Sequence, residues 1–141
     1  MKRLIAAAGL LVTGTLVGIG TARAHHSFAA EFDSKKPINL KGIVTKVEWT
    51  NPHVWIYLNV KDGDGNVTNW GAELGPPHGL QGRGWRRNTL EIGTPVTVDG
   101  FLAKNGASRI NARSITLAAT GGRPGETLDA ASSLKEGKEG K

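Results

Sequence analysis

The sequence contains no cysteine, and its only methionine is Met1. The absence of cysteine excludes disulfides, thiolate metal sites, cysteine nucleophiles and haem attachment through cysteine. Met1 is the only thioether, and it lies in a segment that we expect to be removed. A copper or zinc site in this chain would therefore use histidine, carboxylate or a terminal amine as its ligands.

Charged residues are also absent from Leu4–Gly20, which follows the basic pair Lys2 and Arg3. Ala22-Arg23-Ala24 then supplies the small-x-small pattern that signal peptidase recognises. This arrangement predicts a signal peptide over residues 1–24 and a periplasmic or secreted protein. An uncleaved membrane anchor is the alternative. It is disfavoured because the apolar stretch contains four glycines and two threonines and is marginal for a bilayer, which needs about 20 apolar residues.

The basic surplus of the remaining chain is small. Three of the 18 basic residues lie within residues 1–24, so the net charge of +6 falls to +3 after cleavage. A balance of this size is typical of a solvated surface and does not indicate nucleic acid as a partner. We expect no membrane insertion after cleavage, and a chain of this length fits one domain.

The pattern predicts an N-terminal arm over residues 25–39, a domain over 40–119 and a disordered tail over 120–141. Within the domain, alternation of apolar and polar residues predicts three strands, a short helical segment at 80–90 and two further strands. This order is typical of an all-β fold, a small five-stranded OB-like barrel with a short helical insertion after strand three. A fragment of an open sandwich has the same pattern. We expect no strand from the arm or the tail.

The polar segment Lys61–Asn66 contains two Asp-Gly pairs, which favour the positive φ of hairpin turns. It superficially resembles the start of a calcium loop. A closing glutamate and flanking helices are missing, so the pattern favours a solvated turn.

The four histidines carry the leading functional hypothesis. Cleavage after Ala24 would make His25 the first residue, and its amine and imidazole together can chelate copper or a similar metal. The expected topology brings the loop that holds His53 and the segment that holds His78 to the same end of the domain. The candidate metal ligands are His25, His26 and His53, with copper or zinc as the metal. The alternative is that the His pair is accidental and that His53 only hydrogen-bonds a turn.

A second hypothesis rests on aromatic and basic residues. Trp55 and Tyr57 share one face of the second expected strand, and Trp85 and Arg87 lie in the helical segment. These four residues are candidates for docking a partner protein or a ring-bearing ligand, which would make the protein an adaptor in the cell envelope. Aromatic residues in this position also commonly pack beneath an arm or a helix.

Patterns for catalysis are weak. No Ser-His-Asp order, paired-carboxylate spacing or phosphate loop stands out, and Gly63-x-Gly65 lies in a hairpin rather than between a strand and a helix. We therefore favour a binding protein over an enzyme, although an oxidative copper enzyme with an N-terminal histidine remains an alternative.

Several motifs also occur together in one known family. They are Ala24–Phe28, Gly42-x-Val44, Glu48-Trp49-x-Asn51-Pro52-His53, Gly84-Trp85 and Gly93-x-x-Val96. With these motifs the chain resembles a family of uncharacterised exported bacterial proteins, a domain of unknown function. The resemblance covers most of residues 25–117 and implies an exported small β-domain, with no activity attached. In that family pattern the position of His78 is not a fixed histidine, which implies that His78 is a weaker candidate than the other three.

Overall fold

The computed structural model describes residues 28–119 and 124–131. The expected signal peptide, His25 and His26 lie outside these residues. The elements, in chain order, are α1 (Phe28–Glu31), β1 (Phe32–Glu48), β2 (Trp55–Lys61), β3 (Val67–Glu73), α2 (Pro77–Gly82), β4 (Pro95–Ala103), β5 (Arg109–Leu117) and β6 (Glu126–Asp129). The protein is therefore all-β in class, as the sequence predicts, with two short helices.

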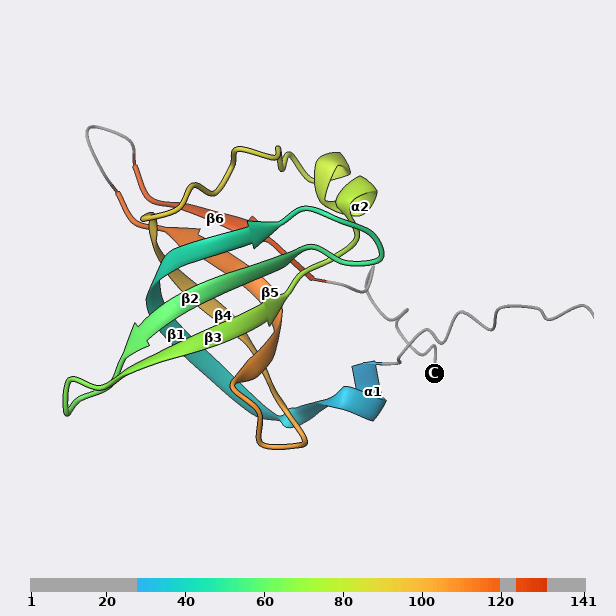
Figure 1. Cartoon of the computed structure of the whole chain (residues 1–141). Coiled ribbons are helices and arrows are strands. Elements are labelled where there is room, and N and C mark those ends of the chain that lie inside the picture. The colour runs from blue at the N-terminus through green and yellow to red at the C-terminus, as the bar shows by residue number, and fades with distance from the viewer. Residues whose placement is uncertain (1–27, 120–123, 132–141) are drawn as a thin grey trace, which may run out of the picture.

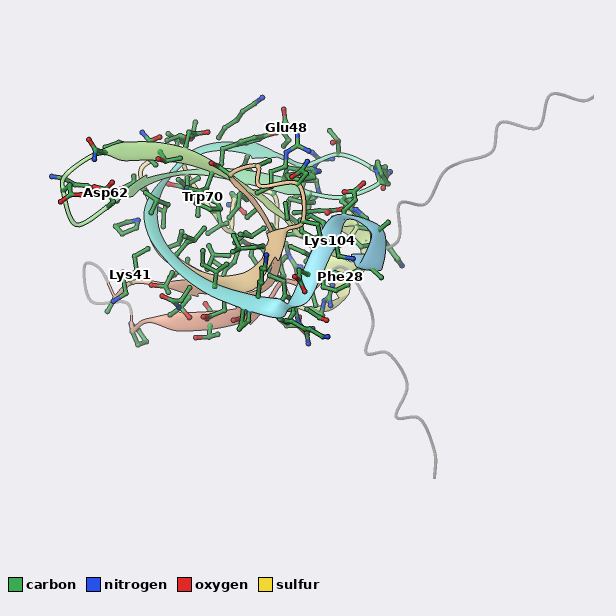
Figure 2. All side chains as sticks on the ribbon, turned by 90° about the horizontal axis from the view of Figure 1, so that it is seen from below. Phe28, Lys41, Glu48, Asp62, Trp70 and Lys104 are labelled. Atoms are coloured by element: carbon green, nitrogen blue, oxygen red, sulfur yellow. The ribbon has the colours of Figure 1, made fainter. Side chains whose placement is uncertain are left out.

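The six strands form one sheet in the order β3-β2-β1-β4-β5-β6. Neighbouring strands are antiparallel. One further pairing, between β3 and β5, is parallel. Because this pairing joins β3 to β5, the ladders of β1 to β5 form a closed ring. Figure 2 shows the strands curving around interior side chains, with Trp70 on the inner side and Lys41 on the outer side.

The interior of the ring is filled by aliphatic side chains that alternate along each strand. Inward residues include Ile56 and Leu58 of β2, Val98 of β4, and Ile110 and Ile115 of β5, all fully buried. One apolar face per strand is the pattern expected when a sheet buries one side and leaves the other to solvent. The outward positions of β2, β3 and β5 are consequently available for a site.

β1 is longer than the sequence predicts, because it starts at Phe32 rather than near Leu40. Phe32 is buried, and Phe28 stacks on it with 5.9 Å between ring centroids. The N-terminal half of β1 pairs with β4 and its C-terminal half pairs with β2. The expectation that the arm adds no strand is therefore wrong from residue 32 onward, because β4 offers a ladder to this segment.

A β-bulge interrupts the alternation of β1 between Val44 and Lys46. Val44 is fully buried, whereas Ile43 is 43% exposed. The sequence pattern places Ile43 and Val47 on the same face, but the extra residue of a bulge shifts the faces by one position. The face predicted to point inward is therefore incorrect for the residues before the bulge. For the residues after the bulge it is correct, because Val47 and Trp49 pack against the core.

The expected disordered tail also contains a strand. β6 pairs with β5 in antiparallel register from Leu117↔Glu126 to Ser114↔Asp129. Ala130 and Ala131, which follow it, are buried. The tail prediction is therefore wrong for residues 126–131, because backbone hydrogen bonds to β5 hold a segment that has few large apolar residues.

The helical segment is shorter than expected. α2 starts at Pro77, where a proline at the first helical position requires no amide donor, and ends at Gly82. Gly84 then adopts a φ of 93°, which turns the chain so that Trp85 enters the core with 1% of its surface exposed. Among the described residues, no helix is long and apolar enough to cross a membrane.

The segment between β2 and β3 is the hairpin turn that the sequence predicts. The Asp62 carboxylate accepts hydrogen bonds from the amides of Asp64 and Asn66 and from the Asn66 side chain. The Asn66 bonds are the main reason that the pKa of Asp62 lies below its ordinary value. Because Asp62 is engaged by its own turn, the calcium-loop alternative gains no support.

Candidate functional site

Four side chains lie side by side on the outer face of the sheet, one from each of four adjacent strands. Trp55 of β2 pairs with Glu73 of β3, Glu73 pairs with Asn111 of β5, and Asn111 pairs with Phe101 of β4. We call this set the outer row. Its two central members are polar, yet Glu73 is only 8% exposed and Asn111 only 3%. Buried polar groups require hydrogen-bond partners, which makes the centre of the outer row chemically distinctive.

The partner of Glu73 is His53, from the loop between β1 and β2. Nδ1 of His53 is hydrogen-bonded to Oε1 of Glu73, and the two side chains are 30% and 10% exposed. Backbone bonds hold this corner in place, since the Val54 amide donates to the Gly75 carbonyl and the Leu74 amide donates to the Val54 carbonyl. The pair therefore joins the start of β2 to the end of β3.

This hydrogen bond has a consequence for the His53 ring. An ionised carboxylate can only accept, so Nδ1 of His53 carries the hydrogen of the bond. In the neutral ring the lone pair is then on Nε2. Carboxylate partners of this kind commonly orient histidines that bind metals through the other nitrogen.

The N-terminal end of the described chain contacts the outer row at Phe101, its member on β4. The Phe28 ring lies edge-on against Phe101, with 5.7 Å between centroids. Figures 1 and 2 show α1 and the loop after β1 toward the same end of the molecule. Phe28 thus lies beside the Phe101 end of the outer row, and His53 contacts Glu73, two strands away from Phe101.

The other histidines are placed as follows. His78 is exposed on α2, at the same end of the sheet as His53, as the topology predicts. His25 and His26 lie outside the described residues. Within the described ranges, no group of three or more His, Cys, Asp or Glu side chains is close enough to hold a metal ion.

Trp55 and Tyr57 point outward from β2, as expected, but both rings are covered by cations. The guanidinium of Arg109 lies 5.6 Å from the Trp55 ring centroid, and Nζ of Lys46 lies 5.2 Å from the Tyr57 centroid. A Cβ on Gly71 would be 3.5 Å from the Trp55 ring and 3.6 Å from the Tyr57 ring. The two rings therefore pack over the bare backbone of Gly71, not under the arm, whose Phe28 packs on Phe101.

Tyr57 also belongs to a surface hydrogen-bond chain. Its hydroxyl donates to Glu48 Oε2 at 3.0 Å, and Lys46 Nζ donates to Glu48 Oε1 at 2.5 Å. Loss of water around the ring, and then the bond to Glu48, raise the pKa of Tyr57. The bonds from Lys46 and then from Tyr57 lower the pKa of Glu48. The bond to Glu48 also raises the pKa of Lys46.

The two docking candidates that follow α2, Trp85 and Arg87, lie in different surroundings. Trp85 is buried, and its indole Nε1 donates to the Asp129 carbonyl at 2.8 Å, so it offers no surface to a partner. Arg87 is exposed, and its Nη1 lies 3.5 Å from the Trp49 carbonyl. The docking prediction is therefore wrong for Trp85, because the tail that was expected to be disordered supplies the acceptor that satisfies its indole.

Glu73 and Asn111 were missed by the sequence analysis. The hairpin contains a signal for Glu73. Counting residues along both strands away from the Asp62–Asn66 turn pairs Glu73 with Trp55, which lies two residues after His53. Asn111 has no comparable signal, since its position depends on the parallel pairing of β3 with β5.

No curated protein matches the sequence. The family model described as a family of unknown function, DUF6152, matches residues 15–111, which include both members of the His53–Glu73 pair. The chain therefore belongs to the DUF6152 family.

Proposed function

We propose that this protein is exported and binds a metal ion, copper in preference to zinc, through His25, His26 and His53. His25 would contribute both its α-amine and its ring, His26 and His53 would each contribute a ring nitrogen, and Glu73 would orient the His53 ring. A set of nitrogen ligands without thiolate suits copper or zinc, and copper binds such sites more tightly than zinc.

The observation that carries this proposal is the His53–Glu73 pair, which lies within reach of the N-terminal histidines. Neighbouring strands are about 4.8 Å apart, so the two steps from Phe101 to Glu73 span roughly 10 Å. Phe28 packs on Phe101, and the three residues from Phe28 back to His25 extend by up to about 10 Å. The distances therefore allow His25 and His26 to meet His53 near Glu73.

We also propose a specific fold within the all-β class. We infer a small OB-like barrel, supported by the closed ring of β1 to β5 and by the parallel β3–β5 pairing. OB folds use the outer face of their second and third strands and the loop between the first two strands for binding. The His53–Glu73 pair lies at that loop and on that face.

Export through a signal peptide over residues 1–24 is part of the same proposal, because cleavage after Ala24 creates the His25 amine. An oxidising compartment outside the cytoplasm also suits a copper site made without thiols.

An adaptor role has weaker support. Trp85 is buried, and the outward rings of Trp55 and Tyr57 are covered by Arg109 and Lys46. A partner would have to displace these cations before it could stack on either ring. Docking on this face is therefore the function we would favour only if the metal proposal fails.

The test uses the chain beginning at His25, with Cu(II) titrated by calorimetry and nitrogen couplings read by electron paramagnetic resonance. His53→Ala should weaken copper binding and remove one nitrogen coupling. Glu73→Gln should weaken it by about 10- to 100-fold while all nitrogen couplings remain, since Glu73 acts through His53. His78→Ala is the matched control and should change neither quantity.

Equal copper affinity in the unchanged chain and in His53→Ala would contradict the proposal. Thermal unfolding of each variant without metal separates loss of the site from loss of the fold. A His53→Ala chain that unfolds at a much lower temperature but keeps its copper affinity would show that the pair serves only to join β2 to β3.

A further inference from the structure

A small cavity lies between the N-terminal end of the described chain and the hairpin that joins β4 to β5. Its volume is about 230 Å³, below the roughly 300–1,000 Å³ of pockets for drug-sized ligands. Figure 1 shows α1 beside this hairpin. None of the residues that line the cavity belongs to the outer row or is a proposed metal ligand. The cavity is therefore a feature separate from the site described above.

Backbone and side-chain hydrogen bonds hold the walls of the cavity in place. Phe32 of β1 pairs with Ala103 of β4, and the Lys104 amide donates to the Glu31 carbonyl at 2.8 Å. Nζ of Lys104 also donates to the Ala29 carbonyl of α1. Figure 2 shows Lys104 beside α1, near Phe28. These bonds join α1 to the hairpin, so the shape of the cavity is set by the fold.

The charges around the cavity favour an anion. Its lining includes the cations Lys104 and Arg109 and the carboxylate Glu31, which gives a net charge of +1. Within residues 28–119 and 124–131, neither cation is within 4.0 Å of a carboxylate oxygen. A bound anion would therefore compensate a positive charge that the described chain leaves unpaired.

Arg109 is oriented by its contact with an aromatic ring. Its guanidinium lies 5.6 Å from the centroid of the Trp55 ring. Stacking on a ring occupies the face of the guanidinium, while its N–H donors point outward in the plane of the group. Such a fork matches the two oxygens of a carboxylate, and bonds of this kind are stronger than those between neutral groups.

We propose that this cavity binds a small organic anion that has one carboxylate and an apolar body. The carboxylate is bound by Arg109 and Lys104, and the apolar body contacts the remaining walls, which include Ala30, Phe32 and Ala103. One negative charge neutralises the net +1 of the lining, whereas a doubly charged phosphate would leave a net negative charge. The small volume restricts the body to a short chain or a single ring.

Benzoate is the test probe, and benzamide is its uncharged counterpart with the same ring. Each is titrated into the isotope-labelled chain beginning at His25, without metal, and nuclear magnetic resonance follows the Lys104 amide and the Trp55 indole N–H. Benzoate should shift both signals to saturation, and benzamide should shift neither at the same concentrations. No saturable shift with benzoate, equal shifts with benzamide, or tighter binding of inorganic phosphate would overturn the proposal.

The variant Arg109→Gln tests the role of the guanidinium. It should weaken benzoate binding by about tenfold or more, because a hydrogen bond to a charged group is lost. Arg109→Lys keeps the charge without the fork, so its affinity should lie between those of the unchanged chain and Arg109→Gln. Thermal unfolding of each variant identifies any loss of the fold.

Arg113→Gln is the matched control. Arg113 lies on the same strand, and its guanidinium is also 5.6 Å from a ring centroid, that of Phe101, but it does not line the cavity. This variant removes the same charge and should leave benzoate affinity unchanged. Equal weakening by Arg109→Gln and Arg113→Gln would mean that benzoate responds only to the overall charge, and the cavity would then not be its site.

Discussion

Gly100 lies beside an irregularity of the ladder between β4 and β5. A Cβ at this position would be 2.3 Å from the Asn111 carbonyl oxygen and 3.2 Å from Cα of Ala112. Both neighbours are backbone atoms within the closed ring, so they have little freedom to move. Gly100→Ala should therefore lower the free energy of unfolding by about 1–3 kcal/mol, measured by chemical denaturation.

The matched control is Gly82→Ala. Gly82 is exposed at the end of α2, and a Cβ there would meet nothing within 4 Å. Alanine also restricts the unfolded chain, so this variant should be unchanged or more stable by up to about 1 kcal/mol. If both variants lost the same stability, the close approach at Gly100 would not be the cause.

Tyr57 is the only tyrosine in the chain, so its ionisation can be followed by ultraviolet absorbance without interference. Its pKa is raised by loss of water and then by the hydrogen bond to Glu48. Glu48→Gln should lower the pKa of Tyr57 toward the ordinary value, without reaching it, because the loss of water remains. Asp62→Asn, in the distant hairpin, should leave the Tyr57 titration unchanged.

The sign of the related stability change follows from linkage. A raised pKa in the folded state means that the folded chain holds the Tyr57 proton more tightly than the unfolded chain. This contribution to stability is present below the ordinary tyrosine pKa and is lost as the pH rises through the raised value. Glu48→Gln should reduce that loss, which a comparison of denaturation at neutral and alkaline pH would detect.

Single residues also show where sequence reasoning reaches its limit. The histidine candidate His53 was found because it follows an Asn-Pro break between two strand patterns. Its partner Glu73 was not found, since a glutamate among alternating residues has the pattern of a solvated position. The sequence makes Trp85 a docking candidate, and it does not reveal that the buried indole donates to the Asp129 carbonyl, 44 residues later in the chain.

At the scale of elements, β6 should open before the ring of β1 to β5. It has four residues, most of them exposed, and pairs along one side with β5. Opening of β6 would free the Ala130 amide and also the Gly75 amide, which donates to Ala130. Amide hydrogen exchange should therefore give Gly75 and Ala130 the same protection, below that of core amides.

The Leu74 amide is the internal control for this prediction. It neighbours Gly75 in the chain but donates to the Val54 carbonyl, which β6 does not touch. Leu74 should keep stronger protection than Gly75. Matching protection at Leu74, Gly75 and Ala130 would mean that β6 opens only with the whole molecule.

Regular alternation made β2, β3, β4 and β5 predictable, because one buried face imposes a period of two on each strand. The bulge in β1 was not predictable, since it depends on how β1 passes from β4 to β2 as its pairing partner. β6 was not predictable for a related reason. It is held by backbone hydrogen bonds to β5 and by bonds from Gly75, Arg83 and Trp85 to residues 129–131, which add to the packing of Leu128 against the core.

At the scale of the whole molecule, the proposed site joins the N-terminal end of the chain to the β1–β2 loop and to β3, which are distant from it in sequence. The proposed cleavage site sets the first residue, Phe28 of α1 packs against Phe101, and the β1–β2 loop brings His53 to Glu73. A metal bound by these parts would connect the arm to the ring of strands. Copper should therefore raise the unfolding temperature of the cleaved protein, and the effect should fade as the pH falls and the histidines take up protons.

The most direct test of the central claim compares two chains that differ by one residue at the N-terminus. One begins at His25 and the other retains Ala24, and the intact mass of each is confirmed before Cu(II) is titrated by calorimetry. Only the first chain places the α-amine and the imidazole on the same terminal residue, so its copper affinity should exceed that of the second by about tenfold or more, or about 1.4 kcal/mol. Equal affinities would contradict the proposed role of the His25 amine, and the adaptor function would then be the better account.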